Sequence, residues 1–133
     1  MISADLPHLV AGACMTVHHT LGPGLCREAY EECLAVELRG LELKVARQKP
    51  LSFDYRGHLI QSASTLDLVV DDGLLVQVLA TDSVSDLERK KMQSHLRLGG
   101  FKTGLLVNFQ VAVMRKGIER FVLKRRTESS PEK

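Results

Sequence analysis

Apolar residues recur at helical spacing in the first part of the chain, which predicts two helices. The first helix is expected to begin after Asp5, its N-cap, and to end near Thr20. The segment Leu21-Gly22-Pro23-Gly24 predicts a helix stop followed by a tight turn. A second helix is expected over residues 25–39, with Glu31 on its exposed side.

Beyond the second helix the apolar pattern changes to that of strands. Asp71-Asp72-Gly73 separates two apolar segments and is a strong hairpin signal. The second of these segments, residues 74–80, is apolar on both faces apart from Gln77, which is typical of a strand in the middle of a covered sheet. Short strands are also expected over residues 44–48, 51–55, 58–60 and 66–70.

The last part of the chain returns to a helix and then to strands. Ser85 is expected to cap a third helix, with Glu88 as its partner in a capping box, and this helix is expected to end near Leu98. Two further strands are expected over residues 104–109 and 118–123.

The order of these elements predicts an α/β fold, with a mixed central β-sheet and helices on both of its faces. The length of 133 residues suits a single domain, which we expect over residues 1–123, and the apolar share of 44% excludes a disordered chain. Residues 124–133 are polar and are expected to form a disordered tail.

Charge and cysteine usage narrow the class of protein. The formal net charge of +2 argues against a protein that coats DNA. An odd number of irregularly spaced cysteines indicates reduced thiols and a cytoplasmic location, and Cys26 and Cys33 are expected to fill the core. The chain has no apolar run long enough to predict a membrane span or a membrane partner.

The predicted hairpin places three side chains of chemical interest together. If Val70 faces Leu74 across the turn, Asp67 faces Gln77, and Leu79 lies on the same side of the sheet as Gln77. An acid on one strand, beside an acid and a lysine two residues apart on the next strand, would form a metal-dependent nuclease site. Here an amide and an aliphatic side chain stand where the second acid and the lysine would be.

A set of short motifs runs along the chain: Val17-His18, Leu21-Gly22-Pro23-Gly24-Leu25, Tyr30-Glu31-Glu32, Arg47-Gln48, residues 66–70, Leu96-Arg97-Leu98 and residues 104–109. In this combination the chain resembles the GxxExxY proteins of the PD-(D/E)XK nuclease superfamily, over about residues 9–123. The resemblance implies a restriction-endonuclease-like (PD-(D/E)XK) core and a bacterial source.

The departures from the family pattern concern its active site. The family glutamate falls on Arg27, and the family Glu-x-Lys falls on Gln77-Val78-Leu79. A family glutamine on the third helix falls on Lys91, which leaves Asp67 and His18 as the matching positions. Magnesium prefers oxygen ligands with one or two carboxylates, so no metal is expected; any Mg²⁺ would bind Asp67 with the help of Gln77 and a backbone carbonyl.

Two readings of the remnant site stay open. Arg27 and Lys91 either neutralise Asp67 in a structural ion pair, which we favour, or turn the pocket into one that attracts anions. Similarly, His18 either lines the pocket or is a hydrogen-bonded residue at a helix C-terminus. A basic surface for nucleic acid, or simply a solvated helix face, is predicted from Arg89, Lys90, Lys91 and Arg97.

We therefore expect a catalytically inactive protein with a PD-(D/E)XK fold that acts as a binding or self-assembling module, without a cofactor. A homo-oligomer is the expected assembly, because edge strands and aliphatic surface support one. The alternatives are a residual Mg²⁺-dependent nuclease and a non-catalytic nucleic-acid-binding protein.

Overall fold

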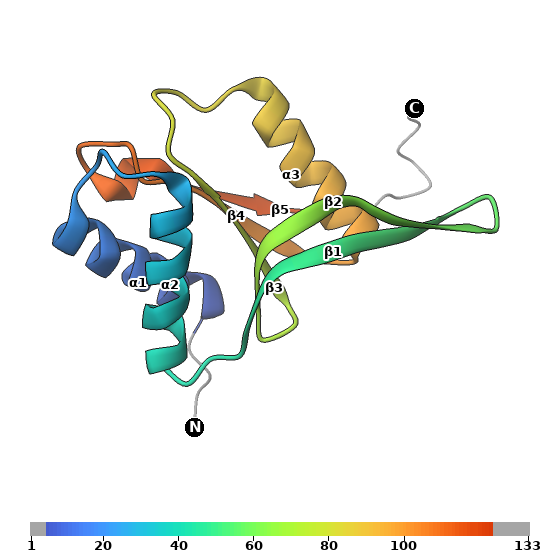
Figure 1. The fold of residues 1–133 in the computed structure, drawn as a ribbon, viewed down its shortest axis with the longest axis horizontal. Helices are drawn as coiled ribbons and strands as arrows, with labels where there is room; N and C mark the ends of the chain where they lie inside the picture. Colours follow the sequence, from blue (N-terminus) through green and yellow to red (C-terminus); the bar gives the residue numbers. More distant parts are fainter. Residues whose placement is uncertain (1–4, 124–133) are drawn as a thin grey trace.

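A computed structural model describes residues 5–123, apart from the side chains of residues 62 and 63 (Figure 1). The helices are α1 (Leu6–Leu21), α2 (Arg27–Gly40) and α3 (Asp86–Gly99), with a short 3-10 helix, η1 (Met114–Gly117). The strands are β1 (Val45–Tyr55), β2 (His58–Val70), β3 (Leu74–Leu79), β4 (Thr103–Asn108) and β5 (Ile118–Val122).

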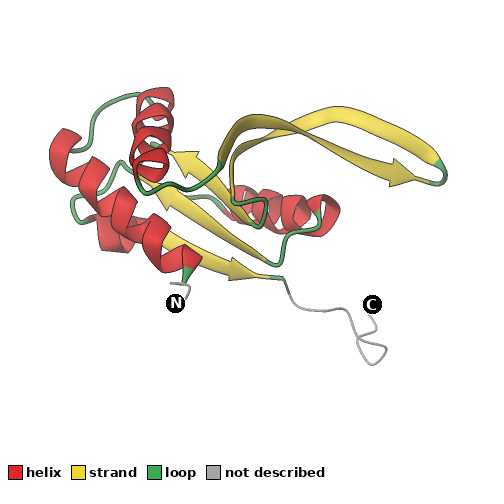
Figure 2. Ribbon diagram, turned by 90° about the horizontal axis from the view of Figure 1, so that it is seen from below, coloured by secondary structure: helices red, strands yellow, loops and turns green. Residues whose placement is uncertain are grey.

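The strands form one five-stranded sheet in the order β1-β2-β3-β4-β5. β3 and β4 run parallel and are joined by α3, whereas the other neighbours are antiparallel. α1 and α2 cover one face and α3 covers the other, as Figure 2 shows. The mixed α/β sheet with helices on both faces, predicted from the sequence, is confirmed.

Each face of the sheet has its own aliphatic core, because side chains alternate along the strands. Leu74, Val76 and Val78 of β3 point towards α1 and α2. Leu75 packs with Met92 and Leu96 of α3 on the opposite face. β3 is therefore buried from both sides, which explains its nearly continuous apolar sequence.

The four short strands predicted over residues 44–70 are in fact two long ones, β1 and β2. They pair along their whole length, with a register irregularity between Leu51 and Phe53. Their outer ends, residues 52–61, project from the body as a two-stranded ribbon, which we call the arm (Figure 1). Its tip is the turn at Arg56 and Gly57.

The helix ends agree in part with the expected caps. The Ser85 side chain accepts a hydrogen bond from the Glu88 backbone N–H at 3.1 Å, as predicted. Asp5 occupies the N-cap position of α1, but its side chain makes no capping hydrogen bond within the described residues. None of the helices within residues 5–123 is both long and apolar enough to cross a membrane. The predicted disordered tail, residues 124–133, lies outside the described residues.

Candidate functional site

β2 and β3 pair at the hairpin and then separate. The register has Val70 opposite Leu74, as predicted, and its last pair is Leu68 with Val76. Beyond this pair, the two strands are joined by hydrogen bonds between a side chain of one strand and the backbone of the other. The Asp67 backbone N–H donates to Gln77 Oε1 at 3.1 Å, and the Val78 backbone N–H donates to Asp67 Oδ2 at 2.9 Å. The separation opens a site at the edge of β3.

Arg27, the first residue of α2, closes this opening. Its Nε donates to the carbonyl oxygen of Val78 at 3.0 Å. Its Nη2 contacts the carboxylate of Glu31, one helical turn further on, and lies 3.3 Å from Asp67 Oδ2. Asp67 and Arg27 thus satisfy the N–H and the C=O that β2 leaves unpaired on Val78. Buried backbone groups require such partners.

Glu31 lies at the centre of the network, and its prediction as an exposed residue is wrong. Only 1% of its surface is exposed. Besides Arg27, its carboxylate accepts hydrogen bonds from Arg47 Nε at 3.2 Å and from Gln48 Nε2 at 3.0 and 3.1 Å. Gln48 also donates to Asp67 Oδ1 at 3.2 Å. This charge is buried because it is surrounded by donors.

Burial and pairing act in opposite directions on the two central charges. Burial raises the pKa of Asp67 above its usual value, although the Val78 N–H, Arg27 and Gln48 each lower it. For Arg27, burial alone would lower the pKa, but Asp67 and Glu31 together raise it. The guanidinium therefore stays charged, whereas the charge on Asp67 is partly disfavoured.

A cavity of about 340 Å³ lies over the network. Its lining includes Arg27, Asp67, Gln77, Leu79 and Lys91, so the structure brings together five of the six residues predicted for the remnant site. Arg27 forms the expected ion pair with Asp67. Lys91 does not, because its ammonium group pairs with Glu88 at 3.8 Å. The remaining lining residues are Gln48, Ser64, Thr65, Val78, Glu88 and His95.

His95 on α3 is a residue of this cavity that the sequence did not single out. It is 6% exposed, and its Nδ1 has no hydrogen-bond partner within the described residues. Burial lowers the pKa of His95, and the nearby Lys91 lowers it further. His95 follows Lys91 by four residues, so both side chains lie on one face of α3. This spacing is the sequence feature that could have identified His95 as a residue of the cavity.

His18, the sixth predicted residue, lies elsewhere. It is in the last turn of α1, and its Nε2 donates to the carbonyl oxygen of Val111 at 2.7 Å. It is not among the residues that line the cavity. It is a hydrogen-bonded residue at a helix C-terminus, the second of the two interpretations of His18 given above.

Acidic side chains offset part of the positive charge that the sequence predicted for nucleic acid. Arg89 Nε contacts both carboxylate oxygens of Glu119, at 3.0 and 3.1 Å. Lys91 has Glu88 as its partner, whereas Lys90 and Arg97 are exposed. Two of the four predicted cations are thus offset by acids.

The residues at the opening do not fit a divalent metal ion. Within the described part of the chain, no group of three His, Cys, Asp or Glu side chains is placed to hold one. The two carboxylates that converge there, Glu31 and Asp67, face the guanidinium of Arg27, as does the Val78 carbonyl. A magnesium ion would have to coordinate these same oxygens, and the fixed positive charge of Arg27 repels it.

Comparison with known proteins places this fold in a family. The search of curated proteins found no match to the chain. A solved structure, the crystal structure of SSO0001, is similar to it with 10% sequence identity and a TM-score of 0.44, over 92% of this chain and 79% of the other. The family model of the PD-(D/E)XK nuclease superfamily matches residues 4–121. Because this match covers almost the whole chain, the protein belongs to the PD-(D/E)XK nuclease superfamily.

Proposed function

We propose that this protein is a non-catalytic member of the superfamily, of the GxxExxY type, and that it acts as a binding or self-assembling module. The observation that carries the proposal is the position of the Arg27 guanidinium. It contacts Glu31, Asp67 and the carbonyl oxygen of Val78 at the same time.

These contacts argue against metal-dependent hydrolysis. A metal ion assists hydrolysis by activating water and by stabilising the charge that develops on the phosphate. Entry of Mg²⁺ would require both carboxylates to release Arg27, although Glu31 is nearly inaccessible to solvent. Leu79 supplies no charged group in place of the lysine, and it packs against the apolar core on the α3 side.

The GxxExxY placement is supported by the part of that motif that is present, Gly24 and Tyr30. The Tyr30 hydroxyl donates to the carbonyl oxygen of Gly22 at 2.5 Å and accepts from the Leu25 N–H at 3.1 Å. Its ring stacks on Phe109 with a centroid distance of 4.6 Å. The tyrosine therefore holds the turn before α2, a structural task that does not depend on catalysis.

The proposal is tested by incubating the purified chain with plasmid and single-stranded DNA and RNA in the presence of Mg²⁺ or Mn²⁺. We expect no cleavage above that of an Asp67→Ala variant prepared in parallel. The comparison separates intrinsic activity from a contaminating nuclease. Metal-dependent cutting that is lost in the Asp67 variant would establish the residual nuclease instead.

A further inference from the structure

The arm ends in a tight turn and carries exposed apolar side chains near its tip. Its turn residues Arg56 and Gly57 have φ angles of 51° and 85°, as a tight two-residue hairpin turn requires. The Gly57 N–H also donates to Asp54 Oδ2 at 3.2 Å. The guanidinium of Arg56 lies 5.6 Å from the centre of the Tyr55 ring. The tip thus presents Tyr55 and Arg56 in a defined arrangement.

The exposure of apolar side chains on the arm is unfavourable for an isolated chain. Tyr55 is 57% exposed and Leu59 is 65% exposed. A two-stranded ribbon without a third strand or a covering helix is marginally stable in water. Its nearby charges are mixed in sign, with Asp54 opposing Arg56, so the tip lacks the basic excess that nucleic acid attracts. Apolar and aromatic side chains on such a projection are typical of a protein contact.

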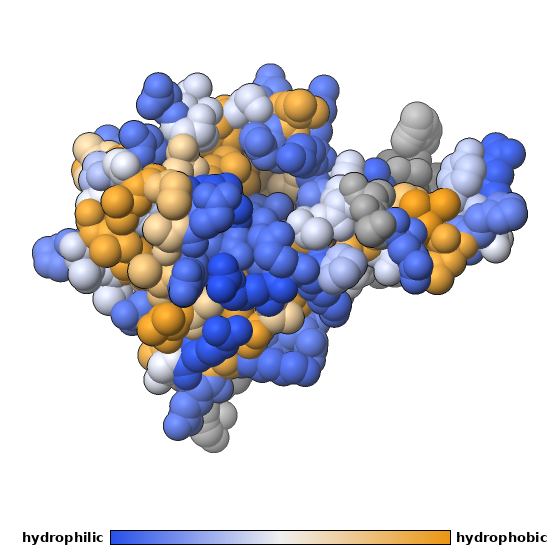
Figure 3. Space-filling model, in the orientation of Figure 1, coloured by the Kyte–Doolittle hydropathy of each residue, from blue (hydrophilic) through white to orange (hydrophobic). Residues whose placement is uncertain are grey.

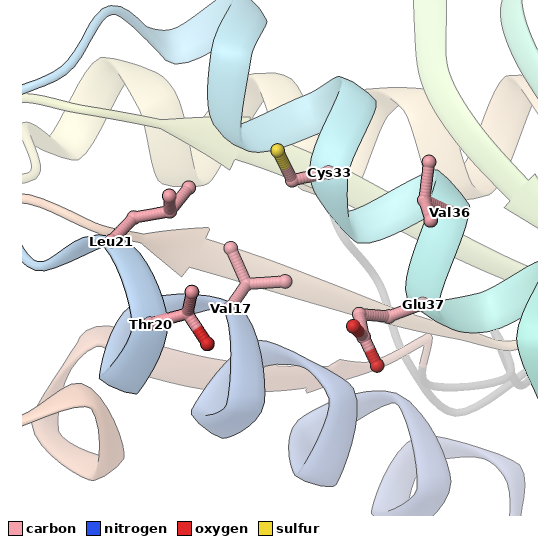
Figure 4. Close-up of a pocket in the computed structure, with 6 residues that line it drawn as sticks. All are labelled: Val17, Thr20, Leu21, Cys33, Val36 and Glu37. Carbon is pink, nitrogen blue, oxygen red and sulfur yellow. The ribbon is translucent and has the colours of Figure 1, made fainter.

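A groove of matching size lies on the opposite side of the molecule, between α1 and α2. Its volume is about 170 Å³, close to that of cavities of about 150 Å³ that hold a benzene ring. Val17, Thr20 and Leu21 of α1 face Cys33, Val36 and Glu37 of α2 across it (Figure 4). Figure 3 shows apolar surface over α1 and α2 and on the arm, with a hydrophilic region between them.

We propose that two copies of this chain assemble through these surfaces, with Tyr55 of one copy inserted between α1 and α2 of the other. The apolar walls bury the ring, and the carboxylate of Glu37 and the hydroxyl of Thr20 offer partners to its phenolic hydroxyl. Arg56, beside Tyr55, pairs with Glu37 across the interface. When the contact is made in both directions, the assembly closes as a two-fold dimer.

This inference rests on the assembling role proposed above and not on the loss of catalysis. The occupant is a second copy because one chain carries both halves of the contact: an aromatic side chain next to a cation, and an apolar groove of the same size next to an anion. The two halves lie at opposite ends of the molecule (Figure 1). The tip of an arm cannot reach the groove of its own chain.

The test measures the mass of the full chain in solution by sedimentation equilibrium over a range of micromolar concentrations. We expect a wild-type dimer. Tyr55→Ser removes the inserted ring, and Val36→Arg blocks the groove. Each change should raise the dissociation constant about thirtyfold or more, as for an interface anchor. Leu87→Arg is the matched control on α3, because Leu87 is 67% exposed and lies outside the groove; it should leave the dimer intact.

Mixing variants separates a lost contact from a damaged fold. Tyr55→Ser keeps its groove and Val36→Arg keeps its arm, so their mixture regains one of the two contacts and should form a heterodimer tighter than either homodimer. Arg56→Glu and Glu37→Arg should each weaken the dimer about fivefold and restore it when combined in one chain.

Each possible result bears on a different part of the proposal. A wild-type chain that stays monomeric overturns both the inference and the assembling role. A dimer that Tyr55→Ser leaves unchanged, or a mixture without heterodimer, overturns the arm contact alone and assigns assembly to another surface. Neither result bears on the cleavage assay, which tests the loss of catalysis separately.

Discussion

Arg27 and Asp67 belong to α2 and β2, and their charged groups meet at 3.3 Å beside the backbone of Val78, a residue of a third element. The ion pair therefore joins three elements at the point where the sheet opens. Its charges are neither isolated nor fully solvated. Removing Arg27 would leave buried carboxylates without this counter-charge. The ion pair can therefore be tested by measuring the free energy of unfolding as well as activity.

Replacing Arg27 by Met should destabilise the fold by about 3 kcal/mol, at the low end of the range for breaking a buried pair, because Glu31 keeps Arg47 and Gln48. Urea unfolding followed by circular dichroism gives the free energy. Arg39→Met is the matched control on the same helix, since the Arg39 side chain is exposed and, within residues 5–123, bonds only to the carbonyl oxygen of Val45. A loss below about 0.5 kcal/mol would show that Glu31 does not depend on Arg27.

The raised pKa of Asp67 predicts a particular pH dependence. A carboxyl whose pKa is higher in the folded than in the unfolded state destabilises the fold when ionised, and this cost disappears as the pH falls through the folded pKa. The stability of the wild type relative to Asp67→Asn should therefore increase between about pH 7 and pH 4. The opposite trend would mean that the pairing with Arg27 outweighs burial.

Restoring the acids and the lysine should restore metal binding. The variant Arg27→Glu, Gln77→Glu, Leu79→Lys replaces the internal cation with a carboxylate beside Asp67 and places a second one on β3. We expect Mg²⁺ binding by calorimetry in this variant and none in the wild type. Adding Asp67→Ala should abolish it. A folded triple variant that does not bind Mg²⁺ would show that other positions exclude the metal.

Tyr30→Phe should cost about 1–2 kcal/mol, since it leaves the Gly22 carbonyl and the Leu25 N–H without their partner. The ring stacking on Phe109 is kept, so the change isolates the hydroxyl. Thermal and urea unfolding measure it, with Thr16→Val, which removes an exposed hydroxyl from α1, as the control. Equal effects of the two changes would contradict a structural role for the Tyr30 hydroxyl.

The cysteines should differ in reactivity. Burial raises the pKa of the Cys14 thiol to about 12, whereas Cys26 is exposed at the start of α2. Since the thiolate is the reactive form, iodoacetamide should label Cys26 in the folded protein and leave Cys14 unmodified. Peptide mass spectrometry reads the sites, and labelling in denaturant is the control. Rapid labelling of Cys14 under native conditions would indicate local opening of α1.

Features fixed by neighbours in the chain were predictable from the sequence. The Ser85 cap depends on a residue three positions away, and the register of Val70 with Leu74 depends on the turn between them. The proximity of Asp67, Gln77 and Leu79 at the cavity followed from that register and from the alternation of side chains.

Features fixed by distant residues were not predictable. Glu31 looks like a solvated charge until Arg47 and Gln48 are brought to it by β1. The long pairing of β1 with β2 was missed because Pro50 interrupts the pattern, although an edge strand tolerates proline. Cys26, expected in the core, is exposed because α2 begins only at the next residue.

The exchange between Asp67 and Val78 has a consequence for how members of this superfamily are sorted. The Asp67 carboxylate accepts the amide hydrogen of the diverging strand, a structural role that does not require hydrolysis. Selection for a stable fold would therefore keep the aspartate in inactive descendants. The residues at positions 27, 77 and 79, which lie next to that aspartate, are therefore a better indicator of nuclease activity than the aspartate itself.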